Sequence, residues 1–345
     1  MEKEKMATVA VLSKKENGVT FFEIKNEELQ IKITNLGCHI LSIFTKDKHG
    51  NMEDVVLGYE NIEDCKQDGS YMGAVVGRVA NRIKGASFEL NGKSYLLVSN
   101  NGLNHLHGGE VGFDQKLFDY KMIENGILFS YISPHMEEGY PGTLELKVKY
   151  ILCGNTLRME YKACSDEDTL CNITNHSYFN LSSGREKIYN HFLKVDADTV
   201  ACVDDHCCTN GKFIEVENTP FDFKEYHKIG ERINQDDEQL KAAGGYDHPF
   251  LLNGTDNQVS LYDEISGRKL TVSTSMPCVQ IYTGNFLEGG CNGKEGKPYE
   301  NRDGIAIETQ FLPDSIHLEK EPKVILKQGE IYHSTTEYTF EVVKA

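Results

Sequence analysis

The sequence has no tryptophan, only eight prolines in 345 residues, and no long uninterrupted apolar segment. Its N-terminal stretch, Met1 to Lys15, contains one apolar run at residues 7–12, between lysine-containing stretches. This run is too short, and its surroundings too polar, for a signal peptide or a transmembrane helix. We therefore expect a cytoplasmic protein with no membrane partner.

Positive charge is also scarce, since 36 Lys and Arg stand against 53 Asp and Glu, for a net charge of −17. An acidic surface repels phosphate backbones and anionic lipid headgroups, so we expect no nucleic-acid partner. A neutral small molecule suits this charge better. We expect the chain to act as a monomer or a weak dimer.

Ten cysteines are scattered along the chain, and without an export signal we expect them to stay reduced. The densest group is Cys202, Cys207 and Cys208, with His206 between them. Structural zinc sites usually space their ligands in pairs such as C-x2-C, which this group does not. We interpret it as a surface loop and expect neither a metal nor a cofactor.

Strand patterns dominate the sequence. In residues 144–150 apolar and charged side chains alternate with a period of two, which places one face on a core and the other in water. Asn91–Gly92 predicts a tight hairpin, because both residues tolerate positive φ. Further strands are predicted at residues 40–44, 127–132, 270–273, 279–282 and 338–343.

Helical periodicity is rare, and the best candidate is residues 229–243, ended by Gly244 and Gly245 as a C-terminal cap. No internal repeat, linker or break in composition marks a domain boundary. The sequence therefore predicts an all-β fold in which residues 1–345 form a single large antiparallel domain.

Polar side chains gather in three separate segments: NGLNHLHGG (101–109), NITNHSYFNL (172–181) and IAIETQFLPD (305–314). They include His176 and Glu308, which could serve as an acid and a base near neutral pH. Taken alone, His176 fits a buried imidazole held by the backbone better than it fits a functional group, and only the other clusters change this balance. Glu308 interrupts an apolar strand, where burial without a partner is costly, so it is either paired or functional.

Six motifs together resemble the aldose 1-epimerase family: GRVANRI (77–83), LHGG (106–109), NHSYFNL (175–181), YDH (246–248), QIYTGNF (280–286) and IETQ (307–310). The resemblance keeps its order from about Asn35 to Val342. It implies a large twisted antiparallel β-sandwich with a sugar cleft across one sheet. It also implies free monosaccharides, galactose and glucose, as substrates.

The resemblance implies roles for individual residues. The histidine of the NHSY motif, His176, corresponds to the general acid, and Glu308 to the general base. The residues implied to bind the sugar are Asn81, Arg82, His107, Tyr178, Asp247 and Gln280. The chain departs from the pattern in lacking tryptophan and in carrying an additional imidazole at His105.

The chemistry implied is a proton transfer. A base takes the proton of the anomeric hydroxyl while an acid protonates the ring oxygen, the aldehyde rotates about C1–C2, and the ring closes on the other face. Two side chains suffice, and no metal is needed.

Three alternatives stay open. Glu308 and Asp247 could flank a glycosidic bond in a hydrolase. A hexose-6-phosphate epimerase would need clustered cations, for which the motifs offer little beyond Arg78 and Arg82. A non-catalytic sugar-binding protein could use the same scaffold.

Overall fold

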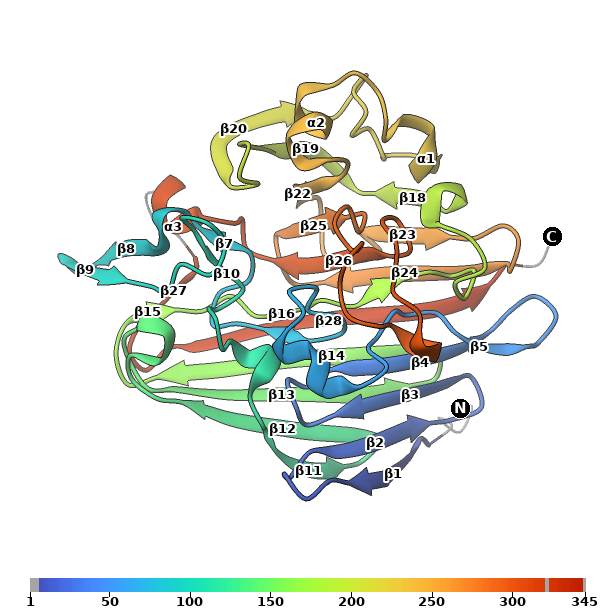
Figure 1. Cartoon of the computed structure of the whole chain (residues 1–345), viewed down its shortest axis with the longest axis horizontal. Coiled ribbons are helices and arrows are strands. Elements are labelled where there is room, and N and C mark those ends of the chain that lie inside the picture. Colours follow the sequence, from blue (N-terminus) through green and yellow to red (C-terminus); the bar gives the residue numbers. More distant parts are fainter. Residues whose placement is uncertain (1–5, 320–322, 344–345) are drawn as a thin grey trace.

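The computed structural model describes residues 6–319 and 323–343 and is built almost entirely of β-strands (Figure 1). Its largest sheet has nine strands in the order β11 (Asp119–Ile123), β12 (Gly126–Ser133), β13 (Leu144–Cys153), β14 (Thr156–Ser165), β28 (Ile331–Val342), β24 (Arg268–Thr274), β23 (Val259–Tyr262), β18 (Phe192–Val195) and β21 (His227–Lys228).

Two smaller sheets accompany it. The first contains β1 (Thr8–Lys14), β2 (Thr20–Lys25), β3 (Leu29–Thr34), β4 (Ile40–Lys46) and β5 (Met52–Asp54) in sequence order. The second has the order β17 (Tyr178–Phe179), β26 (Ile305–Gln310), β25 (Cys278–Tyr282), β22 (Asp247–Leu252), β19 (Ala197–Val203) and β20 (Thr209–Glu215). The ladders of all three sheets are antiparallel.

Short elements complete the chain. Four two-stranded ladders join β6 (Val75–Val76) to β16 (Thr174–Asn175), β7 (Arg82–Ile83) to β10 (His105–Leu106), β8 (Ser87–Leu90) to β9 (Lys93–Leu96), and β15 (Thr169–Leu170) to β27 (Ile325–Leu326). The helices are α1 (Ile229–Arg232), α2 (Glu238–Ala243) and α3 (Ser315–Leu318), with 3-10 turns at Ile62–Lys66, Lys84–Ala86, Phe113–Gln115, Glu137–Gly139, Ile188–Asn190 and Lys294–Gly296.

The expected strands are all present, in β4, β12, β13, β24, β25 and β28, and only the last expectation runs one residue past the end of its strand. The hairpin is confirmed at β8–β9, where Asn91 and Gly92 both have positive φ, 53° and 72°. The all-β fold class is therefore confirmed.

The expected helix over residues 229–243 is wrong as a single element. Two short helices, α1 and α2, replace it, because Asp237 begins a new helix by accepting hydrogen bonds from the backbone N–H groups of Gln239 and Leu240. The predicted stop is confirmed, since Gly244 adopts a left-handed conformation and donates its N–H back to the last turn.

One apolar cluster lies between the nine-stranded sheet and the two smaller sheets. It includes Ile31 from β3, Val148 from β13 and Ile307 from β26, all fully buried. Burying such a side chain contributes about 1.5–3 kcal/mol, so this layer accounts for much of the fold's stability. Figure 1 shows the long strands of the large sheet crossing the molecule, with the blue five-stranded sheet at its lower side.

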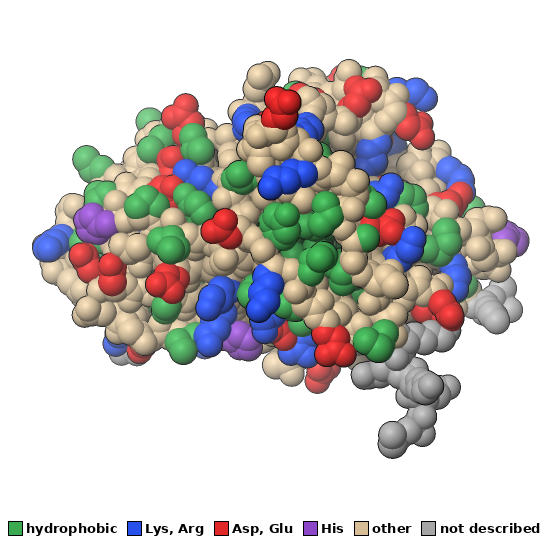
Figure 2. Space-filling model, turned by 90° about the horizontal axis from the view of Figure 1, so that it is seen from below, with side chains coloured by type: hydrophobic (Ala, Val, Ile, Leu, Met, Phe, Trp, Pro, Cys, Tyr) green, Lys and Arg blue, Asp and Glu red, His purple; other side chains and the backbone are tan. Residues whose placement is uncertain are grey.

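The surface carries charges of both signs. Figure 2, seen from below, shows acidic and basic side chains interspersed with hydrophobic ones on the face near the edge strands β1 and β11. Among the described residues, none of the helices is long and apolar enough to cross a membrane.

A glycine turn connects the five-stranded sheet to the polar motif around His176. Gly73 donates its N–H to the carbonyl of His176 at 2.9 Å, and its own carbonyl accepts from the backbone N–H of Ile40 and from Nδ2 of Asn175. Its φ is +76°, and a Cβ on it would lie 2.1 Å from the carbonyl oxygen of Ile40. Only glycine fits this position without moving the backbone.

We predict that Gly73→Ala destabilises the protein by at least about 2 kcal/mol more than Gly50→Ala, because the added methyl group must displace β4. Gly50 is the matched control: its φ is +87°, yet a Cβ there meets nothing within 4 Å. Urea unfolding of both variants measures the difference. Equal losses would show that the close approach at Gly73 has no energetic consequence.

Candidate active site

The alternation of side chains along the strands places the carboxyl groups of the site on one face of the six-stranded sheet. In β26, Ile305 and Ile307 belong to the apolar core, so Glu308, the next residue along the strand, points to the opposite face. Antiparallel pairing sets Gln280 of β25 beside Glu308, and the next strand of the sheet, β22, carries Asp247. The six-stranded sheet thus presents polar side chains on one face and apolar ones on the other.

His176 lies between the short strands β16 and β17. Its backbone N–H donates to the carbonyl of Ala74 at 2.8 Å, and its carbonyl accepts from Gly73, which fixes the direction of the side chain. Its Nε2 atom lies 3.4 Å from Oε1 of Glu308, and both side chains are almost completely buried. Within the described part of the chain, neither Nδ1 of His176 nor Oε2 of Glu308 has a hydrogen-bond partner.

The remaining polar side chains of this motif build the turn. Asn175 bonds to the carbonyl of Gly73 and accepts from Ser177, and Asn180 donates to the carbonyls of Glu186 and Asp303. Their partners are mostly backbone groups, so they hold the segment in place.

His107 is held by Asn81. The two residues exchange two hydrogen bonds: His107 N–H donates to the carbonyl of Asn81 at 3.0 Å, and Asn81 N–H donates to Nδ1 of His107 at 3.1 Å. Both have positive φ. Gly108, which follows, lies against Gly77, where a Cβ would come within 1.7 Å of a carbonyl oxygen.

Arg82 and Asp247 are two further ionisable residues of the site. Arg82 Nε donates to Oδ1 of Asn101 at 3.1 Å, and its Nη1 to the carbonyl of Cys207 at 3.5 Å. Asp247 accepts from Nε2 of Gln280 at 2.6 Å and from the Cys207 thiol.

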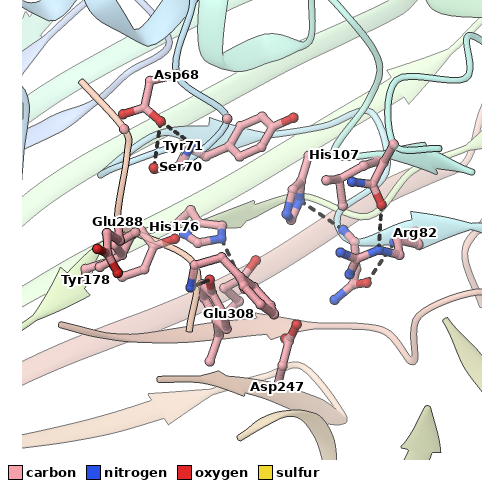
Figure 3. Close-up of a pocket in the computed structure, with 18 of the residues that line it drawn as sticks. Asp68, Ser70, Tyr71, Arg82, His107, His176, Tyr178, Asp247, Glu288 and Glu308 are labelled. Carbon is pink, nitrogen blue, oxygen red and sulfur yellow. Dashed lines mark hydrogen bonds and ion pairs between the residues drawn. The ribbon is translucent and has the colours of Figure 1, made fainter. Parts of the chain in front are cut away.

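These side chains surround one cavity of about 370 Å³ (Figure 3). The sequence-predicted residues that line it are Asn81, Arg82, His107, His176, Tyr178, Asp247 and Glu308. Figure 3 shows His176 and Glu308 pointing toward each other, with Asp247 beyond Glu308 and Arg82 at the far side. Gln280 does not line the cavity; it lies behind Asp247 and orients it.

Several lining residues were missed. Asn101 and Tyr282 belong to segments that the motifs already mark, so their positions could have suggested them. Asp68, Tyr71 and Glu288 lie in loops without any recognisable pattern, and only the folded structure brings them to the cavity.

Two residues singled out in the sequence lie elsewhere. His105 is buried, with Nδ1 bonded to the carbonyl of Val98, and does not line the cavity. Arg78 is buried too, and its guanidinium bonds to Ser133, Pro141 and Thr169. It is therefore a structural clamp and offers no charge to a ligand.

Burial sets the protonation of the two imidazoles. It lowers the pKa of His176 to about 4, and it lowers the pKa of His107 well below its usual range, helped by the nearby His176 and Arg82. Both rings are therefore neutral at cellular pH.

The carboxyl groups shift the other way. Burial raises the pKa of Glu308 well above its usual range; Asp247 raises it further, and Arg82 opposes this. Burial also raises the pKa of Asp247, against the opposing effects of Arg82, Gln280 and Cys207. These surroundings therefore hold the His176–Glu308 pair in its uncharged form, with the proton on Glu308.

Ligand atoms of His107, His176 and Glu308 lie within 4.8 Å of one another, close enough to share a metal ion. The hydrogen bonding of His107 disfavours this. Its Nδ1 accepts from Asn81 N–H, so the neutral ring carries its proton on Nε2 and neither nitrogen has a lone pair to offer. Within the described ranges, Cys202, His206, Cys207 and Cys208 form no such group.

The cleft contains a buried imidazole that faces a buried carboxyl group, on the polar face of a sheet. These features are typical of an enzyme that binds a small polar ligand and transfers protons. The sequence profile for aldose 1-epimerase matches residues 20–339. The chain belongs to the aldose 1-epimerase family. As a member of that family it is an isomerase that interconverts the anomers of aldoses.

Individual relatives agree with this assignment. Galactose mutarotase of Bos taurus is 41% identical over 325 residues, which cover 93% of this chain and 94% of the bovine one. Aldose 1-epimerase of Haemophilus influenzae is 38% identical over 298 residues, covering 84% and 86%. The crystal structure of an aldose epimerase homologue from C. elegans aligns with a TM-score of 0.86 and 29% identity over 98% of this chain and 100% of that one.

The protonation state of His176 is directly measurable. Because burial lowers its pKa to about 4, the ring should stay neutral as the pH falls from 8 to 5 and gain a proton only near pH 4. NMR titration of histidine-labelled protein, with His176→Asn to assign the signal, follows this. A midpoint near the ordinary value of about 6.5 would contradict the burial argument.

Proposed function

We propose that the substrates of this isomerase are free aldohexoses, galactose and glucose among them, and that His176 and Glu308 interconvert their α and β anomers. The observation that carries the proposal is the 3.4 Å contact between these two buried side chains, inside a cleft of polar side chains. Similarity to galactose mutarotase of Bos taurus supports galactose as a substrate.

Glu308 acts as the general base and His176 as the general acid. Glu308 takes the proton of the anomeric hydroxyl while His176 gives one to the ring oxygen, and the C1–O5 bond breaks to leave an open-chain aldehyde. Rotation about C1–C2 and the reverse transfers close the ring on the other face. The protons gained and lost balance, so no other reactant is consumed.

Burial acts on the charge state of the pair during the opening step. Before opening, the base is a carboxylate and the acid an imidazolium; afterwards Glu308 is protonated and His176 neutral. The second arrangement is the one that burial favours, since it raises the pKa of Glu308 and lowers that of His176. Reaching the first arrangement from the uncharged resting pair, by moving the Glu308 proton to His176, therefore costs free energy, and ring opening returns the pair to its resting form.

The other cleft residues bind the sugar. His107 presents an Nε2–H donor, because Asn81 occupies its Nδ1. Asp247 accepts from sugar hydroxyls, and Arg82 donates to oxygens near the reacting centre. Asn81 shapes the loop beside them, Tyr178 forms a wall, and Gln280 acts through Asp247.

The alternatives fit less well. Glu308 faces an imidazole and Asp247 is tied to Gln280, so the geometry favours proton transfer over the two-carboxylate arrangement of a hydrolase. Arg82 is the one Lys or Arg lining the cavity among the described residues, which disfavours a phosphorylated sugar. A non-catalytic protein would have no need of two buried titratable groups in contact.

We also propose that residues 1–345 form one domain that acts in the cytosol as a monomer or a weak dimer, without nucleic-acid or membrane partners. The core cluster joins side chains from Phe22 to Phe340, which supports one domain. The net charge of −17 supports the exclusion of polyanions.

Glu308→Gln should lower the enzymatic mutarotation of fresh α-D-galactose by at least about 100-fold, because a missing general base typically costs about 10²–10⁴. Polarimetry measures the rate. Glu145→Gln, on an exposed position of β13, is the control and should behave as wild type. Near-normal turnover by a folded Glu308→Gln variant would remove Glu308 from the mechanism.

Free sugar should be preferred over phosphorylated sugar. With Arg82 as the available cation, we expect kcat/KM for α-D-galactose to exceed that for glucose 6-phosphate by at least about tenfold. Coupled anomer-specific assays at equal ionic strength give the comparison. The opposite ranking would favour the hexose-6-phosphate epimerase alternative.

A further inference from the structure

Tyr71 occupies an unusual position in the cleft. Its φ is +53°, in the left-handed region that a bulky side chain rarely adopts. The strain is held by the turn that follows, in which Ala74 N–H donates to the carbonyl of Tyr71 at 3.0 Å. A strained residue kept at a cleft points to a function of its side chain.

The ring of Tyr71 packs against both imidazoles of the site. Its centroid lies 4.6 Å from that of His107 and 6.1 Å from that of His176. The two imidazoles lie 5.2 Å apart at a steep angle, so one aromatic ring contacts both. Figure 3 shows Tyr71 on the side of the imidazoles opposite Asp247.

The backbone of the same segment forms hydrogen bonds with the backbone of His176. Ala74 accepts the N–H of His176, and Gly73 donates to its carbonyl. Tyr71 is partly buried and also packs on Ala74, Val76 and Ala80, three buried small or branched side chains. Tyr71 therefore lines the cleft with part of its side chain supported by the core.

We propose that Tyr71 is a positioning residue for this reaction. Its ring fixes the positions of both imidazoles and keeps water from the edge of the His176–Glu308 contact. The inference rests on the proposed function, because the exact positions of the imidazoles matter only if the pair transfers protons to a sugar. Misplacing a catalytic group by about 1 Å can cost roughly 10²-fold in rate.

Other groups also face His176. They are Glu308, His107, Tyr178 and Tyr282, with ring centroids 4.9 Å away for Tyr178 and 6.4 Å for Tyr282. Burial raises the pKa of the Tyr71 phenol, so Tyr71 stays uncharged over the working range and acts through packing.

Two substitutions separate the ring from the hydroxyl. Tyr71→Phe keeps the ring, and we expect kcat and KM within about threefold of wild type. Tyr71→Asn removes the ring and tolerates positive φ; we expect kcat to fall at least about 30-fold with KM changed less than about threefold. Tyr95→Asn, which breaks a stacked pair in the β8–β9 hairpin, is the control and should leave kcat unchanged.

A titration distinguishes positioning from general destabilisation. In the Asn variant the NMR midpoint of His176 should rise from about 4 toward its usual value as water reaches the ring, and in the Phe variant it should not move. This readout does not depend on turnover, so an inactive wild-type protein would refute the proposed function and still leave the contact testable.

Three results would overturn the proposal. A raised KM with unchanged kcat in the Asn variant would make Tyr71 a sugar contact. A reduced kcat with an unmoved His176 midpoint would show that it does not act through the imidazoles. If neither Tyr71→Asn nor Tyr71→Gly, which relieves the strain at positive φ, gave a folded protein by circular dichroism, the role would be structural.

Discussion

The proposed catalytic pair, His176 and Glu308, depends on the cost of burying charge. His176 and Glu308 are almost completely removed from water and 3.4 Å apart, and each lacks a partner among the described residues for its other polar atom. A carboxylate and an imidazolium in such surroundings would lose most of their hydration, which their mutual attraction only partly replaces. The pair therefore rests uncharged, and in the proposed reaction it becomes ionic only when sugar hydroxyls solvate it. The cost of burying charge therefore bears on both the proposed sugar binding and the proposed reaction.

The backbone around the cleft is shaped to impose that burial. Tyr71, Asn81 and His107 have positive φ, as do Gly73 and Gly108, and all five lie in the loops that carry or support the imidazoles. These turns let two distant segments approach the sheet closely enough to exclude water. The sheet itself contributes rigidity and the alternation that points Glu308 and Asp247 outward from the core.

Much of this could be predicted from the sequence, and the rest depended on tertiary contacts. Period-two alternation predicted the long strands, and Asn91–Gly92 predicted a hairpin, because both are local signals. The break near Asp237 was missed, because an N-terminal cap inside an apolar pattern competes with helix periodicity. Motif resemblance identified the residues that line the cavity from β17, β22 and β26, while Tyr71 and Asp68 had no local signal.

Burial also explains what the motifs could not predict about the site. Arg78 and His105 stand in the same motifs as the lining residues, yet the structure turns them into the interior. The protonation of the proposed catalytic pair could not be predicted from the sequence either, because it depends on burial.

The central claim is that His176 and Glu308 work as one proton-transfer unit, and a double-mutant cycle tests it most directly. Polarimetry on fresh α-D-galactose would compare His176→Asn, Glu308→Gln and the double variant with wild type. Residues that act as a unit are strongly non-additive, so the double variant should be no more than about threefold slower than the slower single variant. A double variant slowed by the product of the two single effects would show that the residues act independently, and would contradict the account.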